Sequence, residues 1–207
     1  MIFLYKIVLI NNNMRTATIE RETKETSIKL TLNLDGSGKA DIDAPIKFLN
    51  HMLDALARHS LFDLKIKAEG DTEVDDHHIV EDIGICLGKA LDEALGDKKG
   101  ISRMGHAIVP MDDSHSTVAV DLGGRPYAVI EIPYSEFKES TLGDLKKENI
   151  PHFLESFAMN GKLNLYVEVE GKNDHHKAEC CFKALAKALY QATRVISREL
   201  PSTKEVI

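Results

Sequence analysis

Hydrophobic and polar residues alternate along residues 28–34, which predicts a half-buried β-strand that ends in the Asp-Gly-Ser-Gly turn at residues 35–38. Along residues 48–60 the hydrophobic residues instead recur every three or four positions, as on one face of an amphipathic helix. A second alternating segment at residues 61–70 and a second helical segment at residues 77–95 follow. The first half of the chain is therefore predicted to contain strands and helices in turn.

Capping residues mark the expected ends of the second helix. Asp75 or Asp76 can accept hydrogen bonds from its first backbone N–H groups, and Gly96 is typical of a helix C-terminus. The second half of the chain has the same order, because an alternating segment precedes a helical one at residues 175–192, which Asp174 can cap. Strands and helices in both halves indicate an α+β protein built from two repeats.

The spacing of matching residues supports this duplication. Gly70 and Gly171 are 101 residues apart, whereas His77 and His175 are 98 residues apart, so the loop after Gly70 has three residues more than its counterpart. Loops are where such differences in length are tolerated. We expect an internally duplicated β-sheet and helix sandwich of the α+β class.

The expected boundaries follow from the repeats. Residues 1–13 form an N-terminal extension, read either as an upstream start or as an added edge strand. The first repeat is expected at residues 14–100 and the second at residues 101–207, and together they form one functional unit.

Candidate metal ligands lie at the start of the two repeated helices. His77 and Glu81 are four residues apart and share one helix face, whereas His78 is turned away by about 100°. The second copy repeats this His-His-x-x-Glu pattern in His175, His176 and Glu179. Each half also has one upstream histidine at the matching position, His51 and His152. Six histidines and two glutamates suffice for two metal ions with four ligands each.

The donor types narrow the choice of metal. Nitrogen and oxygen ligands with open positions favour a six-coordinate ion such as Mn²⁺ over a closed, thiolate-rich zinc site, although zinc stays an alternative. A single His-His pair would more simply be a solvated surface pair. Because both copies supply matched glutamates and upstream histidines, metal binding is the better interpretation.

Four basic residues, Arg103, Arg125, Lys183 and Lys204, are candidate anion ligands. Arg125 is the best of them, because the Gly-Gly-Arg-Pro turn between two predicted strands can present a guanidinium fork to a phosphate. Judged one at a time, each is more simply interpreted as a solvated surface residue.

Composition limits the possible functions. A net charge of -7 over 207 residues, with 29% charged and 43% hydrophobic residues, is typical of a soluble acidic protein and argues against broad nucleic-acid or membrane-surface binding. The three cysteines Cys86, Cys180 and Cys181 do not form an even disulfide framework and fit a reducing cytoplasm. Cys180 and Cys181 are interpreted as packing residues.

Several motifs resemble those of the imidazoleglycerol-phosphate dehydratase family. They cover FLNHMLDALARHS, DDHHIVEDIGICLGKAL, DHHKAECCFKALAKAL, MDDS, GGRPY and PSTK, and the resemblance extends over residues 15–207. It implies a cytoplasmic hydro-lyase of histidine biosynthesis that converts imidazole glycerol phosphate into imidazole acetol phosphate. It also implies repeats similar to the second domain of ribosomal protein S5, two Mn²⁺ ions per active site, and trimers that assemble into a 24-subunit shell with active sites between subunits.

The resemblance further implies roles for individual residues. One metal would take His51, His78, His175 and Glu179, and the other would take His77, Glu81, His152 and His176. The repeat relation exchanges the two sets. The substrate would contact these ligands, His152 excepted, and also Glu25, His59, Arg103, Arg125, Lys183, Ser202, Thr203 and Lys204.

The chemistry explains the need for two metals. The proton to be removed sits on a carbon without an adjacent carbonyl, so a general base alone is inadequate. If both ring nitrogens bind metals, the ring can be held as an imidazolate whose electrons expel the hydroxyl. Glu25, Glu179 and Glu81 are the acid/base candidates, and the sequence does not rank them. Two alternatives use the same residues: a dinuclear metallohydrolase acting on a phosphoester, and a non-catalytic metal-binding shell protein.

Overall fold

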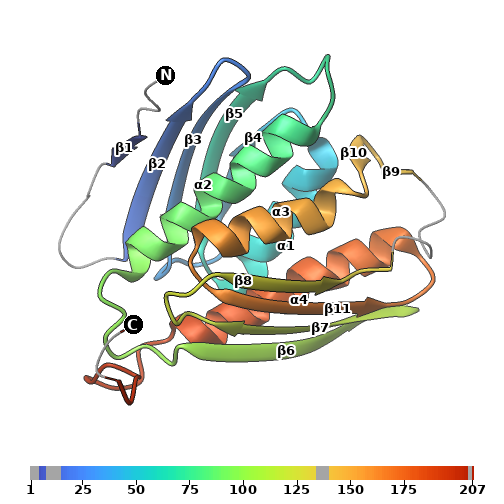
Figure 1. The fold of residues 1–207 in the computed structure, drawn as a ribbon. Helices are drawn as coiled ribbons and strands as arrows, with labels where there is room; N and C mark the ends of the chain where they lie inside the picture. The colour runs from blue at the N-terminus through green and yellow to red at the C-terminus, as the bar shows by residue number, and fades with distance from the viewer. Residues whose placement is uncertain (1–4, 8–14, 134–139, 205–206) are drawn as a thin grey trace.

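The computed structural model describes residues 5–7, 15–133, 140–204 and 207, and within them two sheets enclose four helices (Figure 1). The first sheet has the strand order β1 (Tyr5–Ile7), β2 (Thr16–Glu22), β3 (Thr26–Asn33), β5 (Asp63–Gly70), β4 (Ala40–Asp43). The second has the order β6 (Met104–Met111), β7 (Ser114–Asp121), β11 (Asn164–Glu170), β8 (Tyr127–Glu131). A small hairpin is formed by β9 (Thr141–Leu142) and β10 (Leu145–Lys146).

The helices lie between the sheets (Figure 1). They are α1 (Lys47–Ser60), α2 (His77–Leu95), α3 (Asn149–Asn160) and α4 (Asp174–Thr193). Helix α2 packs on β2 and β3, and α4 packs on β6 and β7, while α2 contacts α3 and α1 contacts α4. Each helix-helix pair therefore joins one helix of the first repeat to one of the second.

Apart from the added edge strand β1, the two sheets have the same topology. Strands β2, β3 and β5 are antiparallel and β4 runs parallel to β5, just as β6, β7 and β11 are antiparallel and β8 runs parallel to β11. Alternate residues of β3 and β7 face the helices and are buried, as the alternation in β3 predicts. The predicted duplicated α+β fold is confirmed.

Helix α4 begins differently from the prediction. Asn173, not Asp174, is the N-cap, and its side-chain oxygen accepts a hydrogen bond from the His176 backbone N–H at 3.1 Å. Asp174 is the first residue of the helix, and its carboxylate lies 3.7 Å from the Lys177 Nζ. The prediction was wrong by one residue because both side chains are good caps and only the backbone conformation chooses between them.

Helix α2 has the predicted boundaries. The Asp75 carboxylate accepts a hydrogen bond from the His77 N–H at 2.8 Å, and the helix ends at Gly96, which has a φ of 58°. The neighbouring Asp76 instead accepts from the Lys146 backbone N–H at 2.7 Å. This bond ties the start of the helix to β10 of the second repeat.

Two glycines let α2 approach α3 closely. A Cβ atom on Gly84 would lie 2.9 Å from the Phe153 carbonyl oxygen, and one on Gly88 would lie 2.4 Å from that of Phe157. Gly84 and Gly88 are four residues apart and so lie on the same helix face. Larger residues would separate the two helices that carry His77 and His152.

The N-terminal extension is only partly described. Residues Tyr5–Ile7 form β1, an edge strand that pairs antiparallel with β2, in agreement with one of the two readings of this segment. The other residues of 1–13 lie outside the described part of the chain. Among the described helices, none has the length and hydrophobicity required to cross a membrane.

Candidate metal centre

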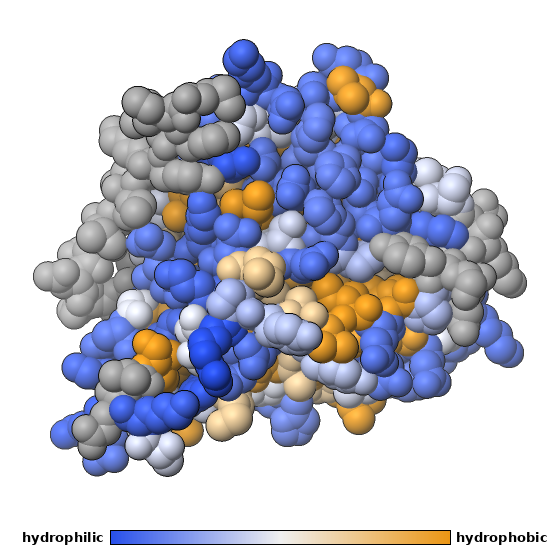
Figure 2. Space-filling model, in the orientation of Figure 1, coloured by the Kyte–Doolittle hydropathy of each residue, from blue (hydrophilic) through white to orange (hydrophobic). Residues whose placement is uncertain are grey.

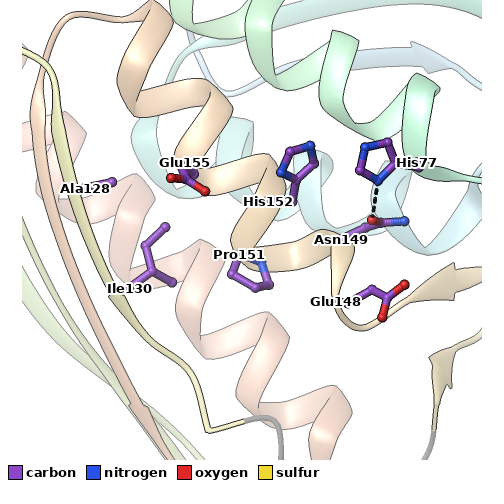
Figure 3. Close-up of a pocket in the computed structure, with 8 residues that line it drawn as sticks. All are labelled: His77, Ala128, Ile130, Glu148, Asn149, Pro151, His152 and Glu155. Atoms are coloured by element: carbon purple, nitrogen blue, oxygen red, sulfur yellow. Dashed lines mark hydrogen bonds between the residues drawn. The ribbon is translucent and has the colours of Figure 1, made fainter.

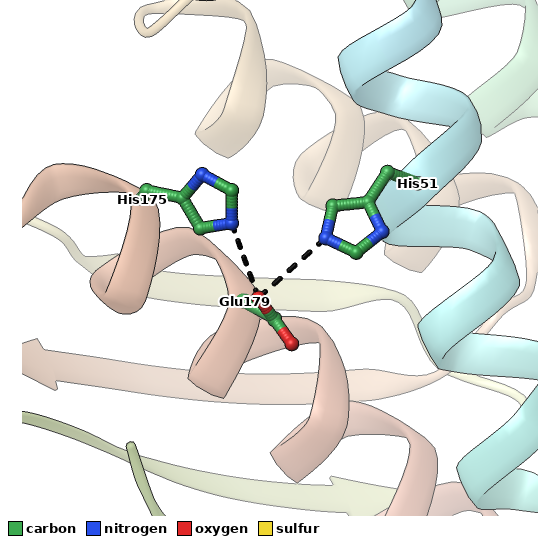
Figure 4. Close-up of side chains that lie close together, drawn as sticks. All are labelled: His51, His175 and Glu179. Carbon is green, nitrogen blue, oxygen red and sulfur yellow. Dashed lines mark hydrogen bonds and ion pairs between the residues drawn. The ribbon is translucent and has the colours of Figure 1, made fainter. Parts of the chain in front are cut away.

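Helices α1 and α4 bring three predicted ligands together, and we call His51, His175 and Glu179 the first cluster (Figure 4). The Nε2 atoms of His175 and His51 lie 3.2 Å and 3.5 Å from the same Glu179 oxygen. His175 and Glu179 are neighbours on α4 because they are four residues apart, whereas His51 reaches across from α1. Each of the three residues offers a donor atom within 4.8 Å of the others.

The charge of Glu179 is stabilised from the opposite side. Burial opposes its ionisation, but the hydrogen bond and charge of Lys183, whose Nζ lies 2.7 Å away, together with the charge of His51, outweigh burial and lower the pKa of Glu179. Phe48 packs edge-on against His175, with ring centroids 5.2 Å apart. The first cluster thus presents an ionised carboxylate beside two imidazoles.

Helices α2 and α3 form the second cluster, which consists of His77, Glu81 and His152. The His77 and His152 rings are stacked, with centroids 4.5 Å apart, and the His152 Nε2 lies 3.6 Å from a Glu81 oxygen. In Figure 3 the His77 Nδ1 donates to the side-chain oxygen of Asn149, at 3.3 Å. This bond leaves the Nε2 lone pair of His77 available to a metal.

The second cluster borders an open cleft of about 500 Å³. Its polar side is formed by His77, His152 and glutamates, whereas Ala128 and Ile130 of β8 and Pro151 give it an apolar side (Figure 3). The same face of the molecule is largely hydrophilic, with an apolar area over β8 (Figure 2). A small heterocycle could therefore contact both the ligands and an apolar surface.

The donor chemistry of both clusters fits a divalent metal ion. Each cluster has two imidazole nitrogens and one carboxylate, which suit Mn²⁺ or zinc. The Nε2 of His152 is buried and has no hydrogen-bond partner among the described residues. Because a buried polar atom without a partner is costly, this nitrogen is well suited to binding an ion.

One predicted ligand of each set lies outside its cluster. The Nδ1 of His78 donates to both Asp71 oxygens, at 3.1 and 3.2 Å, and the Nδ1 of His176 donates to Asp113 at 3.1 Å. The Asp71 hydrogen bond is the main cause of a raised pKa for His78. His176 also has its Nε2 3.5 Å from Asp112. Within one chain, six of the eight predicted ligands meet in two groups of three.

The predicted phosphate ligands do not lie together: Lys183 lies within α4, whereas Arg103 lies beside the C-terminal end of this helix. Arg103 is held by Asp121, with N–O distances of 2.6 and 3.0 Å, and it donates to the Pro201 carbonyl at 2.9 Å. Its backbone N–H donates to the Ala192 carbonyl near the end of α4. At 1.5 Å per residue, that point is roughly 25 Å from His175 at the start of the helix. Arg125 is exposed, as are Thr203 and Lys204, while Ser202 is half-buried.

Two further predicted residues lie near the clusters. His59 is half-buried, and burial followed by the charges of Lys183 and Lys187 lowers its pKa. Glu25, in the turn between β2 and β3, is exposed and acts electrostatically on His78. The residues that orient ligands, Asp71 and Asn149, were missed in the sequence, because neither belongs to a repeated motif.

Comparisons with known proteins agree on one family. Residues 44–189 match the family described as imidazoleglycerol-phosphate dehydratase. The enzyme of that name from Methanothermobacter thermautotrophicus is 55% identical over 191 residues, which cover 92% of this chain and 97% of the relative. The crystal structure of the Staphylococcus aureus enzyme has a TM-score of 0.78 at 32% identity and covers 87% of this chain and 99% of its own. The crystal structure of the Pyrococcus furiosus enzyme, in complex with (S)-C348, has a TM-score of 0.77 at 34% identity and covers 91% of this chain and 99% of its own.

Proposed function

The chain belongs to the imidazoleglycerol-phosphate dehydratase family of hydro-lyases, and we propose that it dehydrates imidazole glycerol phosphate to imidazole acetol phosphate in histidine biosynthesis. The observation that carries this proposal is the pair of matched clusters, His51, His175 and Glu179 in one and His77, Glu81 and His152 in the other. Two equivalent ion sites suit a substrate ring with two nitrogens.

We propose Mn²⁺ as the ion in both clusters, because nitrogen and oxygen donors with open positions favour a six-coordinate ion. Two bound ions would supply Lewis acidity to the two nitrogens of the substrate imidazole. The chain itself orients its ligands: Asn149 fixes the protonated nitrogen of His77, and Lys183 keeps Glu179 ionised. The repeats at residues 14–100 and 101–207 would contribute to each cluster together.

The active site is proposed to lie between copies of the chain. His78 and His176 lie outside the clusters of their own chain, so a neighbouring copy would supply the fourth ligand to each. The backbones of Arg103 and His175 are also roughly 25 Å apart, worked from the helix rise, which is more than the length of such a small substrate. Arg103, Arg125, Ser202, Thr203 and Lys204 would therefore bind the phosphate of a substrate whose ring is held by another copy.

Glu25 and the cluster glutamates remain the proposed acid/base residues. Glu25 is exposed beside His78, so it would reach substrate held at the ion that His78 completes. Glu179 has a lowered pKa and lies between His51, His175 and Lys183, so in this proposal its main role is metal ligation.

The proposed location of the enzyme is the cytoplasm. Its three cysteines are buried and form no disulfide, which suits a reducing compartment.

Metal removal tests the proposal. Chelated protein should lose dehydration of imidazole glycerol phosphate and regain it with Mn²⁺. Glu179→Gln and Glu81→Gln should each reduce Mn²⁺ affinity by more than the roughly 10–100-fold typical of an outer-shell change, whereas Glu93→Gln on the same helix as Glu81 should not. Full activity after chelation would refute the metal mechanism. Phosphate release without dehydration would instead indicate a metallohydrolase, and metal uptake with neither reaction a shell protein.

A further inference from the structure

The two β-hairpins before the helices are equivalent residue by residue. Ile28 pairs with Ala68, and Ser116 pairs with Val169, which follows Ala68 by the repeat offset of 101 residues. Ser116 is therefore the equivalent of Ile28, 88 residues later. The same offset relates β2 to β6 and holds through both turns, which have equal length.

This equivalence relates two carboxylates, because Glu25 in the first turn corresponds to Asp113 in the second. His78 and His176 are likewise equivalent, at the offset of 98 residues. In the second repeat the turn carboxylate is used to orient the histidine, since Asp113 accepts the His176 Nδ1–H at 3.1 Å. Perfect symmetry would require Glu25 to accept the Nδ1–H of His78.

The structure breaks the symmetry at this point. The His78 Nδ1 donates to both oxygens of Asp71, and the Glu25 carboxylate forms no hydrogen bond or ion pair with the rest of the described chain. Asp71 immediately follows Gly70 and begins the loop that is three residues longer in the first repeat. At the equivalent position, after Gly171, the second repeat has Lys172, which cannot accept a hydrogen bond.

Backbone bonds hold Asp71 in place. Its N–H donates to the Glu25 carbonyl at 3.0 Å, and its carbonyl accepts from the Val74 N–H at 2.8 Å. The loop is thus tied to the β2–β3 turn with the Asp71 carboxylate turned toward His78. The Glu25 backbone positions Asp71, while the Glu25 side chain is left exposed.

We propose that Asp71 is a positioning residue: it takes over the orientation of His78 from the turn carboxylate and thereby leaves Glu25 available for the substrate. This proposal rests on the proposed function. With Nδ1–H bound to Asp71, the His78 Nε2 would be the nitrogen left available to a metal ion. Asp113 and Glu25 are equivalent by position but would have different roles, because Asp71 orients His78 in the first repeat. Asp113 would orient a metal ligand, and Glu25 would take part in acid/base catalysis.

The test measures Mn²⁺ affinity by chelator competition alongside dehydration kinetics, in four variants of the full chain. Asp71→Asn should weaken one of the two Mn²⁺ ions by roughly 10–100-fold, the usual effect of losing an outer-shell carboxylate. Asp71→Glu should restore part of this affinity. Glu25→Gln should lower kcat by roughly 10²–10⁴-fold with Mn²⁺ affinity unchanged. Glu73→Gln, an exposed carboxylate in the same loop, should change neither.

A double variant provides the sharpest result. If Glu25 is the displaced partner of His78, it should return to His78 when Asp71 is replaced, so Glu25→Gln should further lower Mn²⁺ affinity only in the Asp71→Asn protein. Wild-type Mn²⁺ affinity in Asp71→Asn, or a Glu25→Gln effect on affinity that is the same in both backgrounds, would overturn the proposal. A wild-type protein that neither binds Mn²⁺ nor dehydrates the substrate would instead refute the proposed function. The thermal midpoints of the metal-free variants identify any loss of folding.

Discussion

The close contact between α2 and α3 predicts how Gly88→Ala changes the free energy of unfolding. Two opposing effects decide the sign: the higher helix propensity of alanine and the overpacking of the contact. Gly88→Ala would place a Cβ 2.4 Å from the Phe157 carbonyl oxygen and 2.7 Å from the Gly161 nitrogen, where ordinary contacts begin at 3.4 Å. Both neighbours are main-chain atoms, so no side chain can rotate away. The helices would have to separate locally by about 1 Å, the difference between 2.4 and 3.4 Å.

The net sign follows from these magnitudes. Alanine is favoured over glycine inside a helix by up to about 1 kcal/mol, but overpacking a tight contact costs about 1–3 kcal/mol. We expect Gly88→Ala to lose roughly 1–2 kcal/mol, which lowers the thermal midpoint by roughly 2–8 °C in a protein of this size. Gly84→Ala, at 2.9 Å from the Phe153 oxygen, should cost less.

The same change should act unequally on the two clusters. His77 and His152 are carried by the separated helices, whereas the first cluster is carried by α1 and α4. Thermal unfolding of the metal-free protein and Mn²⁺ titration check both effects, with Glu93→Ala as a half-buried control on the same helix. Equal or higher stability in Gly88→Ala, or equal weakening of both ions, would show that the close approach does not determine the geometry of the second cluster.

Two further predictions concern residues away from the clusters. Hydrogen bonding to Arg15 outweighs burial and lowers the pKa of Asp35 from its ordinary 3.8, so its stabilising effect is present above about pH 4 and is lost as the pH falls through the lowered value. Asp35→Asn should therefore be less stable than wild type at pH 7 by up to about 1 kcal/mol. Urea titrations at decreasing pH should find that this difference shrinks below about pH 4, and a difference that does not change with pH would contradict this. Burial raises the pKa of the three thiols to about 12, 11 and 12 in Cys86, Cys180 and Cys181. A thiol reagent at pH 8 should label none in the folded protein and all three after unfolding, and rapid labelling of native protein would refute their burial.

Sequence patterns predicted the strands in which every second residue is a fully buried hydrophobic residue, and they missed strands whose inward hydrophobic residues are only half-buried. In β4, Ala40 and Ile42 alternate with two aspartates but are only half-buried, and four residues are at the lower limit of the length over which this pattern predicts a strand. In β6, Gly105 is buried so close to α4 that a Cβ there would lie 2.1 Å from the Ala188 carbonyl oxygen, and the other residues of the strand are exposed or half-buried. Glycine carries no hydrophobic signal, although here it marks the closest packing.

The sequence was enough to predict the ligand residues of the candidate metal centre. It was not enough to predict that each cluster within one chain has only three of its four predicted ligands. In a His-His-x-x-Glu helix start, the first histidine lies on the same face as the glutamate and the second is turned away by about 100°. No rotation of α2 can therefore direct His77, His78 and Glu81 at one ion, and the same holds for α4. Each chain thus has two three-donor clusters and two histidines that face elsewhere. Because the missing and the spare donors are equal in number, we expect copies of the chain to satisfy one another only in a closed assembly, in which every His78 and His176 finds a cluster.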